Sequence, residues 1–337
     1  MSETLPYAWY TDEERLRLER SRIFARSWQY AGRAAQVERP GTFLATDAGG
    51  IPIVVTRDAA GALHGFLNVC RHRGAVLTEG CGERSTIQCR YHAWTYGLDG
   101  ALRTAPRSDR EARFDKGELS LIPASVGTWG PFLFVNPDPD AVSLEEHLGD
   151  LPELLARDID IGGLVFHSRV EFGANANWKI VVENFLECYH CATAHPAFSD
   201  EVDVHPDRYL LETHPTFNAQ FCRAKATGDQ GQFHLLYPNT GLNVFPGPVN
   251  LSIGPIVPAG TGRTERYLDY FFAPDVDQEW LHTFFAFDDQ VGKEDTALVE
   301  SVQRGMASGL AGHGHLLLNA EPLLAAFQHW LAERLDP

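Results

Sequence analysis

Two short stretches, Cys70-Arg71-His72-Arg73-Gly74 and Cys89-Arg90-Tyr91-His92, indicate how the first half of the chain folds. Each places one cysteine and one histidine within three positions of each other. Short apolar runs alternate with glycine-rich turns on both sides of them, which is typical of β-hairpins. We therefore predict an all-β module that carries both Cys/His pairs on loops. Its expected strands cover residues 42–46, 51–56, 63–69, 86–89 and 132–135.

Two cysteines and two histidines could close a tetrahedral zinc site. Zinc fingers usually pair cysteine with cysteine and histidine with histidine, whereas each stretch here holds one of each. A two-iron, two-sulfur cluster of the Rieske type matches better, because one iron takes two thiolates and the other takes two imidazoles. We predict such a cluster on Cys70, His72, Cys89 and His92. Cys81, between the two stretches, is interpreted as a plain thiol.

A second set of metal-binding side chains lies in the other half of the chain. Residues 177–190 read NWKIVVENFLECYH and favour a helix over 177–189, and His195-Pro196 follows shortly after it. Residues five apart on an ideal helix point roughly 140° away from each other. His190 and His195 therefore meet at one metal only if the helix breaks between them. Pro196 disfavours helical geometry at His195 and so provides a reason for the break.

Two histidines and one carboxylate form the facial triad of non-haem Fe(II) oxygenases, which leaves coordination positions open for dioxygen. The carboxylate has to come from elsewhere in the chain, and the predicted helix over 278–306 offers several acidic residues. We favour Asp295 because its neighbours are apolar, with Asp289 as the alternative. A zinc site that uses Cys188 and Cys191, the cysteines on either side of His190, is the weaker hypothesis.

The bulk properties of the chain limit its class. It has 337 residues, enough for two domains, and a net charge of -17, which argues against nucleic-acid binding. No apolar run approaches the roughly 18 residues of a membrane helix. The N-terminus lacks the pattern of a secretory signal, so we expect a cytoplasmic protein without a membrane partner. Six cysteines in such a chain do not require disulfides, and metal ligation or inert burial fits them better.

Strands followed by helices in the second half indicate an α+β domain with helices on one face of an antiparallel sheet. We divide the chain into residues 1–37, with an N-terminal helix that packs on the catalytic domain, an all-β Rieske domain over 38–155, and a catalytic domain over 156–337. Further helices are predicted over residues 11–28, 142–155 and 321–335, and a strand over 164–172.

Together these motifs resemble the catalytic α subunit of Rieske non-haem iron oxygenases, the aromatic-ring-hydroxylating family. The resemblance spans nearly the whole chain. It rests on Cys-Arg-His-Arg-Gly at 70–74, Cys-Arg-Tyr-His at 89–92, Asn-Trp-Lys at 177–179, Glu-Asn-Phe at 183–185 and the His190/His195 pair.

The resemblance implies a catalytic domain of the helix-grip type and a mononuclear Fe(II) on His190, His195 and Asp295. It also implies a head-to-tail homotrimer, in which the cluster of one chain serves the iron of its neighbour. Glu187 would bridge the two sites by contacting His190 in its own subunit and His92 in the next. Many ring dioxygenases carry aspartate there, so the glutamate is a departure. Asn184 matches a family position near the iron.

One subgroup of this family oxidises choline, glycine betaine, stachydrine or carnitine. This chain is similar to that subgroup in three runs, at 187–190, 236–239 and 300–305. That similarity implies O2-dependent hydroxylation or N-demethylation of a quaternary ammonium or amine compound, with electrons from an NAD(P)H-dependent flavin or ferredoxin reductase. Hydroxylation or cis-dihydroxylation of a benzoate-like ring is the alternative. A Rieske electron carrier without oxygenase activity is a third reading, although carriers are short and lack the His190/His195 helix.

Aromatic side chains in the second half are candidates for the substrate pocket, since their faces attract quaternary ammonium groups. They fit an aromatic substrate equally well. The candidates are Phe198, Tyr209, Phe217, Phe221, Phe233, Tyr237, Phe245 and Phe285.

Overall fold

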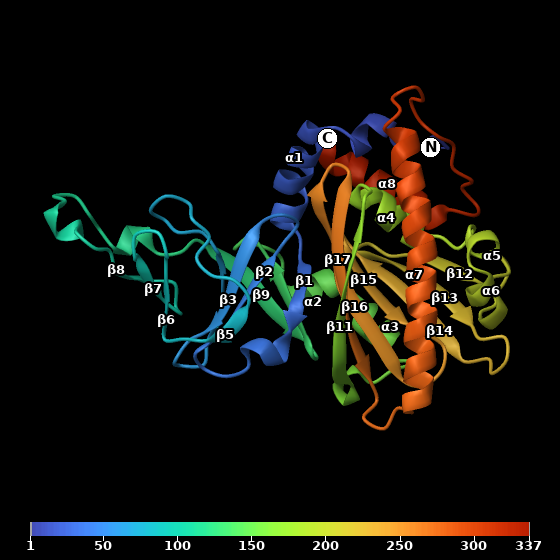
Figure 1. Cartoon of the computed structure of the whole chain (residues 1–337), viewed down its shortest axis with the longest axis horizontal. Coiled ribbons are helices and arrows are strands. Elements are labelled where there is room, and N and C mark those ends of the chain that lie inside the picture. The colour runs from blue at the N-terminus through green and yellow to red at the C-terminus, as the bar shows by residue number, and fades with distance from the viewer. Residues whose placement is uncertain (1, 337) are drawn as a thin grey trace. The chain divides into compact units, whose positions relative to one another are not determined.

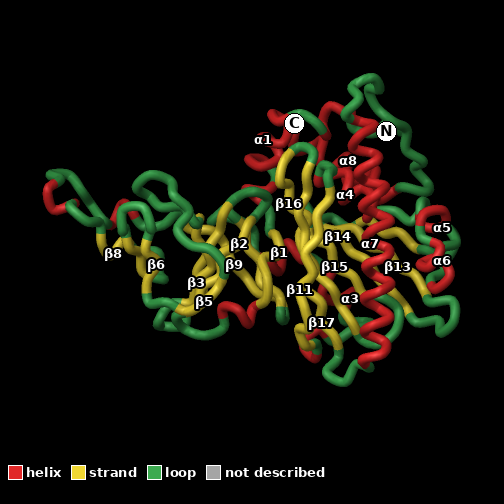
Figure 2. The backbone as a smooth tube through the Cα atoms, in the orientation of Figure 1, coloured by secondary structure: helices red, strands yellow, loops and turns green. Residues whose placement is uncertain are grey.

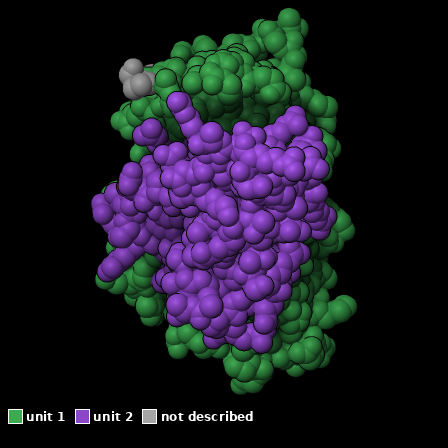
Figure 3. All heavy atoms as spheres, turned by 90° about the vertical axis from the view of Figure 1, so that its left-hand side faces the viewer, with its two compact units in different colours: residues 1–22, 148–337 green, residues 23–147 purple. Residues whose placement is uncertain are grey.

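The computed structural model describes residues 2–336 and divides the chain into two compact units, coloured separately in Figure 3. One unit is residues 23–147, and the other combines residues 1–22 with residues 148–337. The expected α+β class is confirmed. The division falls after residues 22 and 147, whereas the expected domain boundaries were 37/38 and 155/156. Residues 29–33 belong to the β unit because they form β1, which pairs with β10.

The β unit contains two antiparallel sheets, and its strands are yellow in Figure 2. The larger sheet has the order β1-β10-β9-β4-β3-β2-β5, and the smaller one has the order β6-β7-β8. Their bounds are β1 Gln29–Arg33, β2 Thr42–Asp47, β3 Pro52–Arg57, β4 Leu63–Leu67, β5 Cys81–Glu83, β6 Thr86–Gln88, β7 Thr95–Gly97, β8 Leu102–Thr104, β9 Pro123–Trp129 and β10 Phe132–Asn136.

The other unit is built on a seven-stranded antiparallel sheet with the order β11-β17-β16-β15-β14-β13-β12. Its long helix α7 lies against one face of this sheet, as Figure 1 shows. The strands are β11 Val165–Ala174, β12 Leu210–Thr213, β13 Phe217–Arg223, β14 Gln230–Leu236, β15 Thr240–Val244, β16 Asn250–Gly260 and β17 Arg263–Phe272. The helices are α1 Glu13–Arg22, α2 Leu144–Leu148 at the unit boundary, α3 Leu151–Leu155, α4 Trp178–Phe185, α5 Cys191–Ala194, α6 Pro196–Glu201, α7 Gln278–Met306 and α8 Pro322–Leu335.

Several predicted helices are shorter in the structure, each for a local reason. The helix expected over 11–28 is α1 followed by a 3-10 turn. The helix expected over 142–155 is divided at Gly149, whose positive φ of 56° ends α2. The helix expected over 177–189 ends at Phe185. Within residues 2–336, no helix is both long and apolar enough to cross a bilayer.

Helix α4 is held in place by polar groups that are buried with it. Asn177 caps its N-terminus by accepting a hydrogen bond from the Lys179 backbone N–H. The Lys179 ammonium, fully buried, donates to Glu19 at 2.5 Å, and the Trp178 indole donates to the same carboxylate at 2.7 Å. Near the other end of the helix, the Tyr10 hydroxyl donates to Glu183 at 2.6 Å. These contacts fix the position from which the chain continues to the site.

Removing one partner of the buried Lys179–Glu19 pair should strongly destabilise this unit. We expect Lys179→Met to lower the free energy of unfolding by about 3–5 kcal/mol, since it leaves a buried carboxylate without its counter-charge. Urea titration followed by tryptophan fluorescence measures the change. The matched control is Lys293→Met, which breaks an ion pair whose lysine is 71% exposed and should leave the transition nearly unchanged. Equal effects of the two variants would contradict this role for Lys179.

Candidate active site

The two Cys/His stretches form loops with the same backbone pattern. In each loop the cysteine N–H donates to the carbonyl five residues later, from Cys70 to Ala75 and from Cys89 to Trp94, both at 2.8 Å. The residue four positions after each cysteine has positive φ: 75° at Gly74 and 58° at Ala93. The two loops thus present their cysteine and histidine in equivalent ways.

The side chains of these loops are arranged for a shared cluster. Cys70 and Cys89 are buried free thiols, whereas His72 and His92 are exposed. The two imidazole centroids lie 4.6 Å apart, and His72 stacks on Trp94 at 4.8 Å. One zinc ion would hold its ligand atoms about 4 Å or less from one another. Among residues 2–336, only the histidine group in the other unit brings three such atoms within 4.8 Å, so the loops fit a two-iron cluster better than a single ion.

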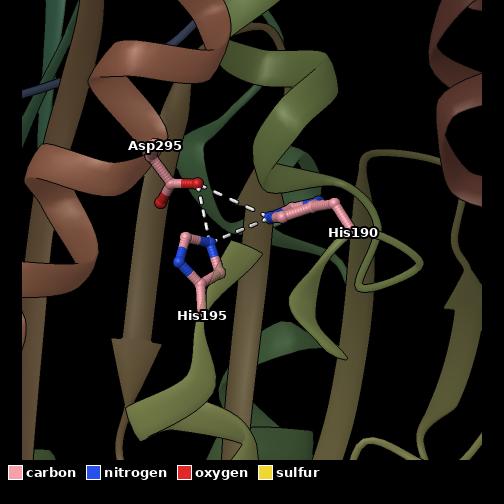
Figure 4. A group of neighbouring side chains, drawn as sticks. All are labelled: His190, His195 and Asp295. Atoms are coloured by element: carbon pink, nitrogen blue, oxygen red, sulfur yellow. Dashed lines mark hydrogen bonds and ion pairs between the residues drawn. The ribbon is translucent and has the colours of Figure 1, made fainter. Parts of the chain in front are cut away.

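That group is His190, His195 and Asp295 (Figure 4). The two Nε2 atoms lie 3.1 Å apart, and Asp295 Oδ1 lies 3.0 Å from His195 Nε2 and 3.5 Å from His190 Nε2. Three donor atoms therefore converge on one point, as the facial triad of a mononuclear iron requires. Asp289, the alternative ligand, is instead exposed and pairs with Lys293.

The Nδ1 atoms of both histidines face further carboxylates. His190 Nδ1 contacts Glu187, which also accepts a hydrogen bond from the His190 backbone at 3.1 Å. His195 Nδ1 lies 2.8 Å from Glu294. Metal-ligating histidines usually donate their second N–H in this way, because it fixes the ring and leaves the other nitrogen for the metal. The role of Glu294 was not predicted, although its place beside Asp295 was visible in the sequence.

The chain brings the histidines together by leaving helical geometry twice. Helix α4 ends at Phe185, and His190 precedes the short helix α5. His195 has φ −121° and ψ 75°, which is non-helical, and Pro196 starts α6. The break expected from Pro196 is therefore present.

Cys188 and Cys191 form a disulfide on either side of His190. The expectation that metal ligation or inert burial fits the cysteines better than a disulfide is wrong for this pair. Their separation of three residues, in a turn that places the Cα atoms 4.9 Å apart, brings them within bonding distance.

The three ligands shift one another's pKa values. Burial lowers the pKa of His190, but hydrogen bonds with Asp295 and Glu187 more than compensate and raise it to about 9. Burial would likewise raise the pKa of Asp295, yet its hydrogen bonds with the two histidines hold it well below the usual range. Without a metal the site thus retains a proton on His190 at neutral pH.

A cavity of about 190 Å³ adjoins these ligands. Asn184 and Glu187 line it, together with aromatic rings from α4, α6, α7 and four strands or strand ends. Of the predicted aromatic residues, Phe198, Tyr209, Phe233 and Phe245 line the cavity.

Four predicted aromatic residues do not line the cavity, namely Phe217, Phe221, Tyr237 and Phe285. Phe285 faces another side of α7, against Tyr270, while Phe284, Phe287 and Asp288 face the cavity. Phe217 and Phe221 pack beside the buried His234, and Tyr237 packs on Phe327 and Trp330. Sequence reasoning missed Phe172, Phe185, Phe284 and Phe287.

Comparison with known proteins agrees with this architecture. A model of the Rieske [2Fe-2S] domain matches residues 27–123, and a model of the ring hydroxylating alpha subunit (catalytic domain) matches residues 161–235 and 223–337. The carnitine monooxygenase oxygenase subunit of Acinetobacter pittii is 33% identical over 98% of this chain and 94% of its own length. The chloroplastic choline monooxygenase of Spinacia oleracea is 32% identical over 99% and 79%.

A solved structure is similar over the same extent. The quaternary ammonium Rieske monooxygenase CntA in complex with L-carnitine matches with a TM-score of 0.86 at 32% identity, covering 99% of this chain and 96% of that one. The chain belongs to the ring-hydroxylating α-subunit family of Rieske oxygenases. It is therefore an oxidoreductase with a Rieske 2Fe–2S cluster and a mononuclear iron, and the predicted family and cofactors are confirmed.

Metal binding to the triad should displace a proton. His190 must be neutral to ligate, and its pKa of about 9 keeps it protonated below that pH. We expect iron-free protein to release close to one proton per Fe(II) bound at pH 7.5, and less as the pH rises through about 9. Calorimetry under nitrogen in buffers of different ionisation enthalpy measures this. Metal uptake without proton release at pH 7.5 would contradict the protonated state.

Proposed function

We propose that this chain is a monooxygenase that oxidises a small quaternary ammonium compound at a carbon attached to nitrogen. The observation that carries the proposal is the position of the His190, His195 and Asp295 group beside a cavity walled by phenylalanine rings. The similarity to carnitine and choline monooxygenases over almost the whole chain supports it.

We assign the ligands as follows. Cys70, His72, Cys89 and His92 hold the 2Fe–2S cluster, and His190, His195 and Asp295 hold the mononuclear iron. When bound, these groups supply single electrons and the activation of dioxygen. The donor sets fit these groups because the two thiols are buried and unpaired, and the three triad atoms converge on one point.

The phenylalanine wall binds the cationic end of the substrate. This wall consists of Phe198, Phe233, Phe245 and Phe287, which come from different elements, and four pairs of their ring centroids lie between 5.0 and 6.3 Å apart. A trimethylammonium group packed against these rings gains cation–π attraction. It has no N–H donor, so it loses nothing where the wall offers no hydrogen-bond acceptor. The wall also limits water around the reacting carbon.

Glu187 is the proposed link between the two iron centres. Its carboxylate holds His190 by both the ring and the backbone, so it is fixed close to the iron site. In a head-to-tail homotrimer its other contact would be His92 of the neighbouring copy. The electrons would come from an NAD(P)H-dependent flavin or ferredoxin reductase. Asn184 lines the cavity beside Glu187 and is proposed to help position the substrate or Glu187.

A substrate panel tests the reaction. Hydroxylation of a carbon attached to nitrogen yields an unstable product that separates into an amine and an aldehyde. We expect choline, L-carnitine or γ-butyrobetaine to be consumed in the presence of a reductase, NADH and O2, with equal amounts of amine and aldehyde formed. Mass spectrometry and an aldehyde assay measure both. Oxidation of benzoate with no turnover of any ammonium compound would replace the proposal by ring hydroxylation.

The link through Glu187 has a matched control. We expect Glu187→Gln to retain both iron centres but to slow electron transfer from cluster to iron about 10- to 100-fold, since the neutral amide is a poor partner for two imidazoles. Glu294→Gln alters the equivalent partner of His195 and should affect iron affinity more than this rate. Stopped-flow spectroscopy of the pre-reduced protein measures the rate. Equal rates in wild type and Glu187→Gln would refute the link.

A further inference from the structure

One arginine lies in the cavity without a hydrogen bond or a close ion pair to another described side chain. Arg266 is half-buried on β17 and lines the same cavity as the triad. Phe172 stands directly opposite on the antiparallel neighbour β11, and the guanidinium carbon lies 5.5 Å from its ring centroid. The stacked ring holds the flat guanidinium in place without using any of its N–H donors.

Within residues 2–336, the Arg266 side chain makes no hydrogen bond and no ion pair within 4.0 Å. Arg169, on the same pair of strands, in contrast donates from Nε and from Nη2 to the Asp269 carboxylate, each at 2.7 Å. The five N–H donors of Arg266 have no acceptor among the described residues, so water or a ligand has to satisfy them. A ligand carboxylate can replace that water with charge-assisted hydrogen bonds.

The acidic residue available on the facing helix is otherwise engaged. Asp288 on α7 accepts a hydrogen bond from the Tyr270 hydroxyl at 2.6 Å and forms no ion pair with Arg266. Burial raises the pKa of Asp288, and the opposing effects of the Tyr270 hydrogen bond and of the more distant Arg266 charge do not cancel that rise. Glu187 and Asp295 face the histidines. Among residues 2–336, no carboxylate oxygen therefore lies within 4.0 Å of the Arg266 guanidinium, and its N–H donors can face a ligand.

Arg266 and the phenylalanine wall lie over different parts of the sheet. Phe233 lies on β14 and Phe245 just beyond β15, while Arg266 and Phe172 lie on β17 and β11. Neighbouring strands are about 4.8 Å apart, so two to three strands separate the wall from Arg266 by roughly 10–14 Å at the backbone. Both groups line the same cavity of about 190 Å³, so a short zwitterion in it can reach both.

We propose that Arg266 binds a carboxylate of the substrate and that the cavity selects betaines, which carry a quaternary ammonium group and a carboxylate, over ammonium alcohols such as choline. This rests on the proposed function. The carboxylate would take two parallel N–H donors of Arg266, while the ammonium group rests on the phenylalanine wall beside His195.

Calorimetry on the iron-loaded protein under nitrogen tests the proposal, with γ-butyrobetaine and its methyl ester as probes. The two ligands share length and ammonium group and differ in the negative charge. We expect wild type to bind the free acid roughly 10- to 100-fold more tightly than the ester, as for hydrogen bonds to a charged group. Arg266→Gln should bind both as weakly as wild type binds the ester, and Arg266→Lys should retain part of the difference.

Arg263→Gln is the matched control, because Arg263 is exposed on the same strand and does not line the cavity. Arg263→Gln should preserve the preference of wild type for the free acid over the methyl ester. Equal affinity of wild type for acid and ester would overturn the role of Arg266 while leaving the ammonium substrate class intact. An equal loss of both ligands in Arg266→Gln would show a structural role and overturn it too. Failure of wild type to bind either ligand or choline would reject the proposed function itself.

Discussion

The end of helix α4 at Phe185 is the constraint on which the site depends. Two histidines five residues apart diverge on a helix, so His190 and His195 meet only because the chain leaves helical geometry after this residue. The start of α4 is fixed by the buried Lys179–Glu19 pair, and the loop after it is fixed by Glu187. The irregular segment that holds the two histidines thus follows a helix that buried contacts keep in place, and Glu187 holds the segment itself.

Charge organises the rest of the cavity. Three carboxylates face the two histidines, which explains why the metal-free site holds a proton and why a divalent cation suits it. Farther along the sheet lies the positive charge of Arg266, whose guanidinium lies over the Phe172 ring and has no carboxylate oxygen within 4.0 Å among residues 2–336. Between these two regions the walls are mainly phenylalanine. A substrate with a cationic and an anionic end matches this distribution better than a neutral ring.

The sequence predicted what local patterns determine. The Cys/His stretches and the long helix over 278–306 followed from spacing and periodicity, whereas Asp295 was favoured from its apolar neighbours together with the family resemblance. Features set by distant contacts were missed: β1 joins the β unit because it pairs with β10, far along the chain. The sequence also did not show which face of α7 lines the cavity. Phe284, Phe285 and Phe287 are equally hydrophobic, and only packing decides that Phe284 and Phe287 face it. The sequence did not point to Arg266 as a cavity residue, because Phe172, the ring that its guanidinium contacts, lies on another strand.

We propose that His190, His195 and Asp295 hold one iron with open coordination positions beside a substrate cavity. Adding nitric oxide to the reduced protein and recording its electron paramagnetic resonance spectrum tests this most directly. We expect a high-spin iron–nitrosyl signal that changes when γ-butyrobetaine is added and disappears in Asp295→Ala, while the Rieske signal persists in both proteins. An iron–nitrosyl signal that survives in Asp295→Ala, or its absence from fully iron-loaded wild type, would contradict the claim.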